Sequence, residues 1–185
     1  MVEVEKDSTT STLISTLRAA QQNLADLEAF KGALTKTNAQ ELIEVGKEGE
    51  PNAGLSCLHV ICAQGFHRQA LAVIDRASTL QILGEVVDGR ARDDDVYRSW
   101  TPLFFAVVSG PNGHPEIVNL LIKNGSQVNL TDNKGRTALH YAAELGQDDT
   151  LDLLLAAGAD PNVAEKETGR TALHLAIENG QFNSV

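Results

Sequence analysis

A short block of residues recurs four times along this chain of 185 residues. Each copy begins with serine or threonine and continues into apolar residues, and the copies start 45, 36 and 34 residues apart. The four blocks are Ser56–His59, Thr101–Phe104, Thr137–His140 and Thr171–His174. Self-similarity at a period of about 20–50 residues is typical of solenoid proteins, in which each copy is one supersecondary unit. The repeat therefore predicts a row of stacked units.

Apolar residues between the blocks recur at helical spacing. Two groups show it most clearly: Ile117, Val118, Leu120 and Leu121, and then Leu151, Leu153, Leu154 and Leu155. Pro115 suits the first turn of one helix, and Gly125 and Gly158 suit the position just after a helix ends. Helices of roughly 8–10 residues are unstable alone in water, so each copy must bury its apolar side against its neighbours.

The third copy, from Asp132 to Pro161, reads DNKGRTALHYAAELGQDDTLDLLLAAGADP. It resembles the ankyrin repeat, whose period is about 33 residues. The resemblance implies an all-α solenoid of stacked helix-turn-helix units with short β-hairpin-like fingers. It also implies hydrogen bonds that brace the turn and the next repeat, formed here by Thr137, His140, Thr171 and His174. Phe104 replaces the histidine in the second copy, so the brace there is expected to be apolar or absent.

The N-terminal part predicts a helical cap. Residues 1–10 are expected to be disordered, and residues 11–52 form an N-terminal helical cap or a degenerate first repeat. A helix ending at Lys31–Gly32 is predicted by the seam of Leu13, Leu17, Ala20, Leu24 and Leu27. A short coiled coil is the alternative for this seam. A second helix is predicted from Asn38, with Glu41 completing a capping box.

Four ankyrin repeats are predicted after this cap, at 53–86, 100–130, 131–163 and, incomplete, 164–185. The first spacing is about eleven residues longer than the others. We interpret residues 75–99 as a lengthened connection between repeats, with an extended finger at 87–99. Added length in such a turn costs little closure entropy.

Charge and composition exclude several classes of protein. The net charge of −10 disfavours nucleic acid and anionic membranes as partners. The first residues lack a basic-then-apolar signal pattern, and no apolar stretch approaches the roughly 18 residues that span a bilayer. Two cysteines are too few for a disulfide framework and point to a reducing compartment. We therefore expect cytoplasmic or nuclear localisation.

The sequence contains only weak candidates for metal-binding or catalytic residues. Cys57, His59 and Cys62 offer zinc-binding atom types, but residues five positions apart on a helix do not share a face well. Structural roles are favoured for all three. Asp93–Asp95 is interpreted as solvated loop charge and Asp148–Asp149 as charge at a helix N-terminus. The sequence predicts no enzyme, no metal and no cofactor.

The expected function is non-catalytic binding of a protein partner as a scaffold, adaptor or inhibitor. In ankyrin proteins partners lie along the concave side, so the resemblance implies contacts at finger tips and exposed inner-helix positions. These are Tyr97, Arg98, Trp100, Val108, Ser109, Asn133, Lys134, Arg136, Glu144, Leu145, Glu167, Thr168, Arg170, Glu178 and Asn179. Trp100, Arg136 and Arg170 precede their threonines and are expected to form a column across three repeats. Trp100 has a second interpretation, as a cover for the core.

Two finer functions remain open. Residues 160–178 are similar to a repeat of the IκB family, which binds Rel-type transcription factors and masks them. That family's phosphodegron is missing, because Asp7-Ser8-Thr9-Thr10 lacks the glycine. Alternatively, these residues are the targeting arm of a larger enzyme or signalling protein whose catalytic part lies beyond Val185.

The fourth copy stops after its first helix, which leaves apolar residues uncovered: Leu173, Leu175, Ala176 and Ile177. Terminal repeats normally present a polar outer face. We expect that the chain is a fragment, that another chain covers this end, or that the chain associates with itself there.

Overall fold

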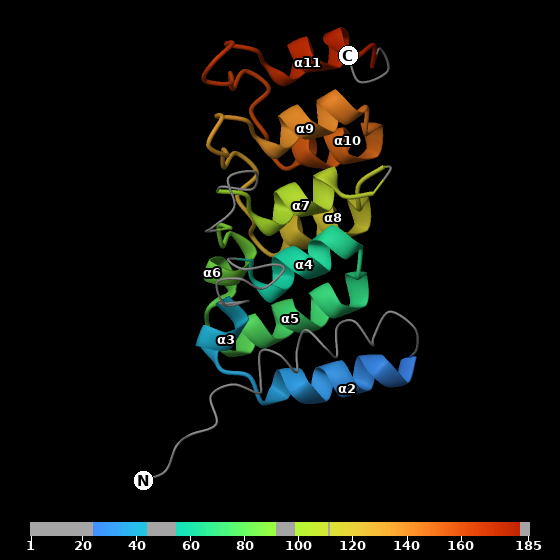
Figure 1. The fold of residues 1–185 in the computed structure, drawn as a ribbon, viewed down its shortest axis with the longest axis vertical. Coiled ribbons are helices and arrows are strands. Elements are labelled where there is room, and N and C mark those ends of the chain that lie inside the picture. The colour runs from blue at the N-terminus through green and yellow to red at the C-terminus, as the bar shows by residue number, and fades with distance from the viewer. Residues whose placement is uncertain (1–23, 44–54, 92–98, 111, 182–185) are drawn as a thin grey trace.

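The helices form two adjacent rows that run the length of the molecule (Figure 1). The computed structural model describes residues 24–43, 55–91, 99–110 and 112–181, with the backbone alone at 24–26, 40 and 41. We call the helices that follow the repeated blocks inner helices: α4 (Cys57–Gln64), α7 (Pro102–Val108), α9 (Ala138–Leu145) and α11 (Ala172–Glu178). The outer helices are α5 (His67–Thr79), α8 (Pro115–Lys123) and α10 (Asp148–Ala156).

Each inner helix contacts the next inner helix along the row, and the outer helices do the same. Thr101, Thr137 and Thr171 occupy N-cap positions with extended backbone. Gly125 and Gly158 follow the last residues of α8 and α10 with positive φ values of 87° and 86°, as the sequence predicted. The chain is therefore an all-α solenoid of stacked helix pairs.

Fingers connect each outer helix to the next inner helix and project from one side of the stack (Figure 1). No β-strand occurs among the residues that the structure describes. Backbone hydrogen bonds close the fingers instead: the amide of Ala91 donates to the carbonyl of Trp100 (2.8 Å), Asp132 to Arg136 (2.9 Å) and Glu165 to Arg170 (2.8 Å). The fingers are thus hairpin-like turns.

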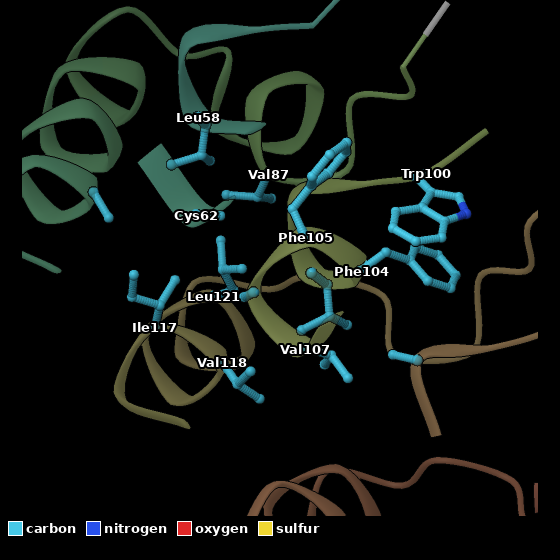
Figure 2. Close-up of a cluster of buried hydrophobic side chains, with 14 of the residues drawn as sticks. Leu58, Cys62, Val87, Trp100, Phe104, Phe105, Val107, Ile117, Val118 and Leu121 are labelled. Atoms are coloured by element: carbon cyan, nitrogen blue, oxygen red, sulfur yellow. The ribbon is translucent and has the colours of Figure 1, made fainter. Parts of the chain in front are cut away.

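One core runs through the stack. Figure 2 shows its centre, where Leu58 and Cys62 of α4, Phe105 of α7 and Ile117 and Leu121 of α8 are buried in one cluster. The inner helices approach closely because small side chains lie between them. Cys62, Ala142, Ala143 and Ala176 are all buried, as expected from their size.

The N-terminal helix extends further than the sequence predicted. Helix α2 (Leu24–Thr35) passes through Gly32, whereas we expected it to end at Lys31–Gly32. Burial of Leu34 and two hydrogen bonds from Arg76 explain the extension, because the Arg76 guanidinium donates to the carbonyls of Thr35 (3.0 Å) and Thr37 (2.7 Å). Helix α3 (Ala39–Ile43) lies within the second predicted helix. The predictions for residues 1–23 and 44–54 lie outside the described residues.

The long connection after the first repeat is only partly a finger, contrary to our interpretation of residues 75–99. Its first part continues α5 to Thr79 and then forms a further helix, α6 (Leu83–Val87). Val86 and Val87 are buried in the core, and this burial stabilises a helix where a loop was predicted. The rest of the predicted finger, 92–98, lies outside the described residues.

A buried hydroxyl in α10 offers a stabilising substitution. Thr150 is fully buried, and its Oγ1 has no hydrogen-bond partner among the described residues. Because an unsatisfied buried hydroxyl is costly, we expect Thr150→Val to raise the free energy of unfolding by about 1 kcal/mol in urea denaturation. Thr137→Val is the matched control and should lower the free energy of unfolding, because the Thr137 hydroxyl that it removes lies 2.9 Å from Nδ1 of His140. A loss of stability in both variants would contradict the prediction.

The turn between α7 and α8 leaves no room for a side chain at Gly113. Its φ is +65°, and an added Cβ would lie 2.8 Å from the carbonyl oxygen of Val107. We expect Gly113→Ala to lower the free energy of unfolding by about 2–3 kcal/mol, because this neighbour is backbone that cannot easily move. Gly169→Ala has a similar φ of +69° and no atom within 4 Å, so it should cost only about 1 kcal/mol. Equal losses in thermal or urea denaturation would argue against the steric explanation.

Candidate functional site

The signature residues connect neighbouring repeats by hydrogen bonds, as the resemblance implied. Nδ1 of His140 accepts from the amide of Thr137 (3.1 Å), so the proton of the neutral ring lies on Nε2. That Nε2 donates to the carbonyl of Arg170 in the next repeat (3.3 Å). His174 accepts from Thr171 in the same way (3.2 Å). These bonds fix the base of each finger against its inner helix.

The first repeat uses Ser56 and His59 for the same purpose. Nδ1 of His59 accepts from the amide of Ser56 (2.9 Å), and Nε2 reaches the carbonyls of Gly89 (3.0 Å) and Trp100 (3.2 Å). Burial lowers the pKa of His59 to about 4 despite these bonds, so the ring is neutral at physiological pH. His59 is a structural link between the repeats.

The two cysteines lie beside His59 in the core. Burial raises the pKa of the Cys57 thiol to about 12 and raises the pKa of Cys62 as well. Both side chains therefore remain thiols at neutral pH, and thiols are poor metal ligands and nucleophiles. Within the described ranges, no three histidine, cysteine or acidic side chains come close enough to hold a metal ion.

An apolar brace replaces the histidine bond in the second repeat. Phe104 stacks on Trp100, with ring centroids 5.8 Å apart, and meets Tyr141 of the next inner helix edge-on at 5.9 Å. Figure 2 shows Trp100 and Phe104 side by side. Trp100 is only 7% exposed, so of its two interpretations the structure matches the cover for the core. Trp100 therefore adds no exposed side chain to the predicted column.

Arg136 is the centre of a polar network between the third and fourth repeats. Its Nε donates to Glu165 (2.6 Å), its Nη1 donates to Glu144 (2.9 Å), and the guanidinium lies 5.6 Å from the Tyr141 ring centroid. The side chain is 17% exposed. The Thr168 hydroxyl and the Arg136 guanidinium lower the pKa of Glu165, which keeps this carboxyl ionised. Arg136 therefore holds the two fingers together and offers little free surface.

Arg170 and Glu178 differ from this network because their side chains are 42% and 47% exposed. Arg170 Nη1 lies 3.2 Å from a Glu178 carboxylate oxygen across the surface of α11. Exposed ion pairs of this kind contribute at most about 1 kcal/mol to stability. Both side chains are thus available for contact with another molecule.

The remaining predicted contact residues divide into three groups. Asn133, Lys134, Glu167 and Thr168 are exposed on the last two fingers, and Leu145 and Asn179 are exposed at the ends of inner helices. Val108 and Ser109 are half-buried. Tyr97 and Arg98 lie outside the described residues. The described members other than Trp100 therefore keep some exposed surface, and their part in binding stays a prediction.

Sequence reasoning missed Asp132 and Glu165, two acidic members of this network. Asp132 accepts from the amides of Lys134 and Arg136 (2.9 Å each) and from the hydroxyl of Tyr141 (2.7 Å). Glu165 begins the next finger at the equivalent position. An acidic residue at the start of both fingers is the signal that could have identified this network.

A groove of about 610 Å³ lies between α2 and α5, at the first end of the stack. Its lining is apolar at Leu27, Leu34 and Leu71 and charged at Lys31 and Arg68. None of the predicted contact residues lines it. Over the residues that the structure describes, no helix is both long and apolar enough to cross a bilayer.

Stacked helix pairs joined by hairpin-like fingers define a helical repeat protein with a ready-formed inner surface. A family model described as Ankyrin repeats (3 copies) matches residues 71–165 and 112–185. The chain belongs to the ankyrin-repeat family.

Several curated proteins are similar to this chain. E3 ubiquitin-protein ligase KEG of Arabidopsis thaliana is 35% identical over 123 residues, which is 65% of this chain and 7% of that protein. Putative ankyrin repeat protein YahD of Escherichia coli is 44% identical over 62 residues, 32% of this chain and 31% of YahD. NF-kappa-B inhibitor delta of Mus musculus is 28% identical over 141 residues, 76% of this chain and 38% of that protein. The chain thus spans well under half the length of these relatives.

Proposed function

We propose that this chain is a non-catalytic module that binds a protein partner along its inner surface. The observation that carries the proposal is that the last two fingers are bonded to each other and carry exposed side chains of mixed chemistry. The amide of Lys166 donates to the carbonyl of Lys134 (2.9 Å), which joins the last two fingers directly. Because the fingers are already held together, binding requires little further ordering.

The exposed side chains supply both apolar and charged contacts. Leu145, 44% exposed at the end of α9, provides apolar area, and the Arg170–Glu178 pair provides charged area. Asn133 and Lys134 extend this surface to the finger tip. Surfaces that combine an apolar centre with a polar rim are typical of transient protein interfaces. We propose that this binding takes place in the cytoplasm or the nucleus.

Two finer functions are favoured by particular similarities. Residues 160–178 and the match to NF-kappa-B inhibitor delta favour an inhibitor of a Rel-type transcription factor. The match to E3 ubiquitin-protein ligase KEG favours the targeting arm of a larger enzyme. Binding of a purified Rel homology domain distinguishes them, because the first function requires it and the second does not.

Site-specific photo-crosslinking tests the general proposal. A photoreactive amino acid replaces Asn133 or Leu145 on the inner surface, and Asp152 on the outer helix α10 is the exposed control position. In a cell extract we expect crosslinked protein from the two inner positions and little from Asp152. Crosslinks only from Asp152 would place the interface on the outer helices and overturn the proposal.

A further inference from the structure

The groove between α2 and α5 has an apolar lining. The two helices lie side by side at one end of the stack (Figure 1). Leu27 and Leu34 line the groove from α2, and Leu71 lines it from α5. Leu71 is 42% exposed. A single exposed leucine is ordinary on a protein surface, but an exposed leucine in a groove of about 610 Å³ marks a surface that suits an apolar occupant.

The charged side chains of this lining do not select a charged occupant. Lys31 Nζ donates to a Glu28 carboxylate oxygen (3.0 Å). The Arg76 guanidinium donates to two backbone carbonyls at the end of α2 and just beyond it. The remaining two, Arg68 and Asp75, have opposite charges. The lining therefore favours an occupant that is apolar and nearly neutral.

One polar atom of the lining needs a hydrogen-bond acceptor. Nε of Arg76 is buried, and it has no hydrogen-bond partner among the described residues. A buried donor without an acceptor is costly. The occupant is therefore expected to place an oxygen atom near Arg76, at the end of the groove where α2 ends with Thr35.

The sequence just before α2 has the composition that this groove requires. Residues 8–23 carry a single charged side chain, that of an arginine. Leu13, Leu17 and Ala20 form an apolar seam at helical spacing. Residues 8–12, at the start of the segment, are all serine or threonine and supply hydroxyl oxygens. Because the segment is joined directly to α2, its effective concentration at the groove is high.

The length of the segment matches the length of the groove. As a helix, residues 11–20 would span about 15 Å, and the 12 residues of α2 span about 18 Å. A turn at residues 21–23 would let the segment run antiparallel to α2, which brings its hydroxyl groups to the Thr35 end, where Arg76 lies. A straight continuation of α2 would instead carry Leu13 about 16 Å beyond the start of α2 and away from the groove.

We propose that residues 11–20 turn back and occupy the groove between α2 and α5, with their apolar seam against Leu71. The occupant is thus a segment of this chain that lies outside the described residues. Burial of apolar surface on both sides drives the contact, and the short connection keeps the entropy cost of closure low. The inference goes beyond the proposed function, which concerns the inner surface. It also decides against the coiled coil as the role of this seam.

Disulfide formation between engineered cysteines tests the inference on the full chain. The pair Leu17→Cys and Leu71→Cys places one thiol on the seam and the other in the groove. The matched control is Ser15→Cys with Leu71→Cys, because Ser15 lies about 200° from Leu17 around a helix. In a glutathione redox buffer, the first pair should form an intrachain disulfide about tenfold faster than the control pair. Cys57 and Cys62 do not compete, because burial raises the pKa of both thiols.

Three outcomes would overturn the inference. They are equal rates for the two pairs, which a tethered but undocked segment would give, the absence of an intrachain disulfide from both pairs, and chains joined to each other through the single substitution Leu17→Cys, as a coiled coil requires. Circular dichroism of the reduced variants checks that each is folded. If Leu71→Cys unfolds the chain, Ala20→Cys with Arg68→Cys gives the same test, because Arg68 lines the groove and is exposed.

Discussion

Phe104→Ala should lower the free energy of unfolding by about 3–5 kcal/mol, the largest single loss that we expect in this chain. Phe104 is 1% exposed and fills the position where the other repeats carry a hydrogen-bonded histidine. Its ring contacts Trp100 of its own repeat and Tyr141 of the next. Truncation leaves a cavity at the junction of two repeats, and no hydrogen bond of the kind that His140 makes takes its place.

Leu173→Ala is the matched control for Phe104→Ala. Leu173 lies at the second position of α11 and is 48% exposed, so its truncation removes little buried area. We expect a loss below about 0.5 kcal/mol in urea denaturation. If Phe104→Ala cost no more than Leu173→Ala, the aromatic brace would not hold the second repeat to the third.

Acid should destabilise this protein through His59. Its pKa is about 4 in the folded chain, against an ordinary value of 6.5, because burial disfavours the charged ring. Between these values the unfolded chain binds more protons, so stability falls as the pH decreases from 6.5 to about 4. The full contribution is about 3 kcal/mol and changes little below that range. Urea denaturation at a series of pH values measures it.

The substitution His59→Gln separates the contribution of His59 to the pH dependence of stability from the contributions of other titrating groups. Burial also lowers the pKa of His140, and hydrogen bonds from Thr168 and Arg136 lower that of Glu165, so both groups act in the same direction. We expect the variant to be less stable at neutral pH but to lose less stability on acidification. A pH dependence identical to that of the unsubstituted chain would mean that His59 is not the group responsible.

The repeated blocks were sufficient to predict the stacked helix pairs, because each copy contains the same local signals for where a helix begins and ends. Threonine begins an inner helix, and Gly125 and Gly158 end outer helices. These signals act over a few residues, so they can be read directly from the sequence. The hydrogen bonds of His140 were accessible in the same way, since they follow from its place in the repeat.

Features that depend on contacts between distant residues were not predictable from local patterns. Helix α6 forms because Val86 and Val87 are buried by neighbouring elements, which a connection of unusual length does not reveal. The extension of α2 depends on Arg76, about forty residues away in sequence.

In the candidate site, too, local patterns predicted some features, and contacts between distant residues determined the others. Position in the repeat identified Arg136 and Arg170, but their difference in exposure arises from Glu165 on the following finger. Trp100 precedes its threonine just as the arginines do, yet it turns into the core because Phe104 and Tyr141 provide an aromatic surface there. Equivalent positions in a repeat therefore do not guarantee equivalent roles.

The order of contacts along the stack determines the order in which the repeats unfold. Inner helices pack against the adjacent inner helices and against the outer helix of their own repeat, so stability is a sum of adjacent junctions. Helix α11 has its one extensive junction with α9, as α2 has with α5, and should exchange its amide hydrogens before the other inner helices. Opening should then advance one repeat at a time, so that the fingers at that end loosen while those beside α7 remain closed.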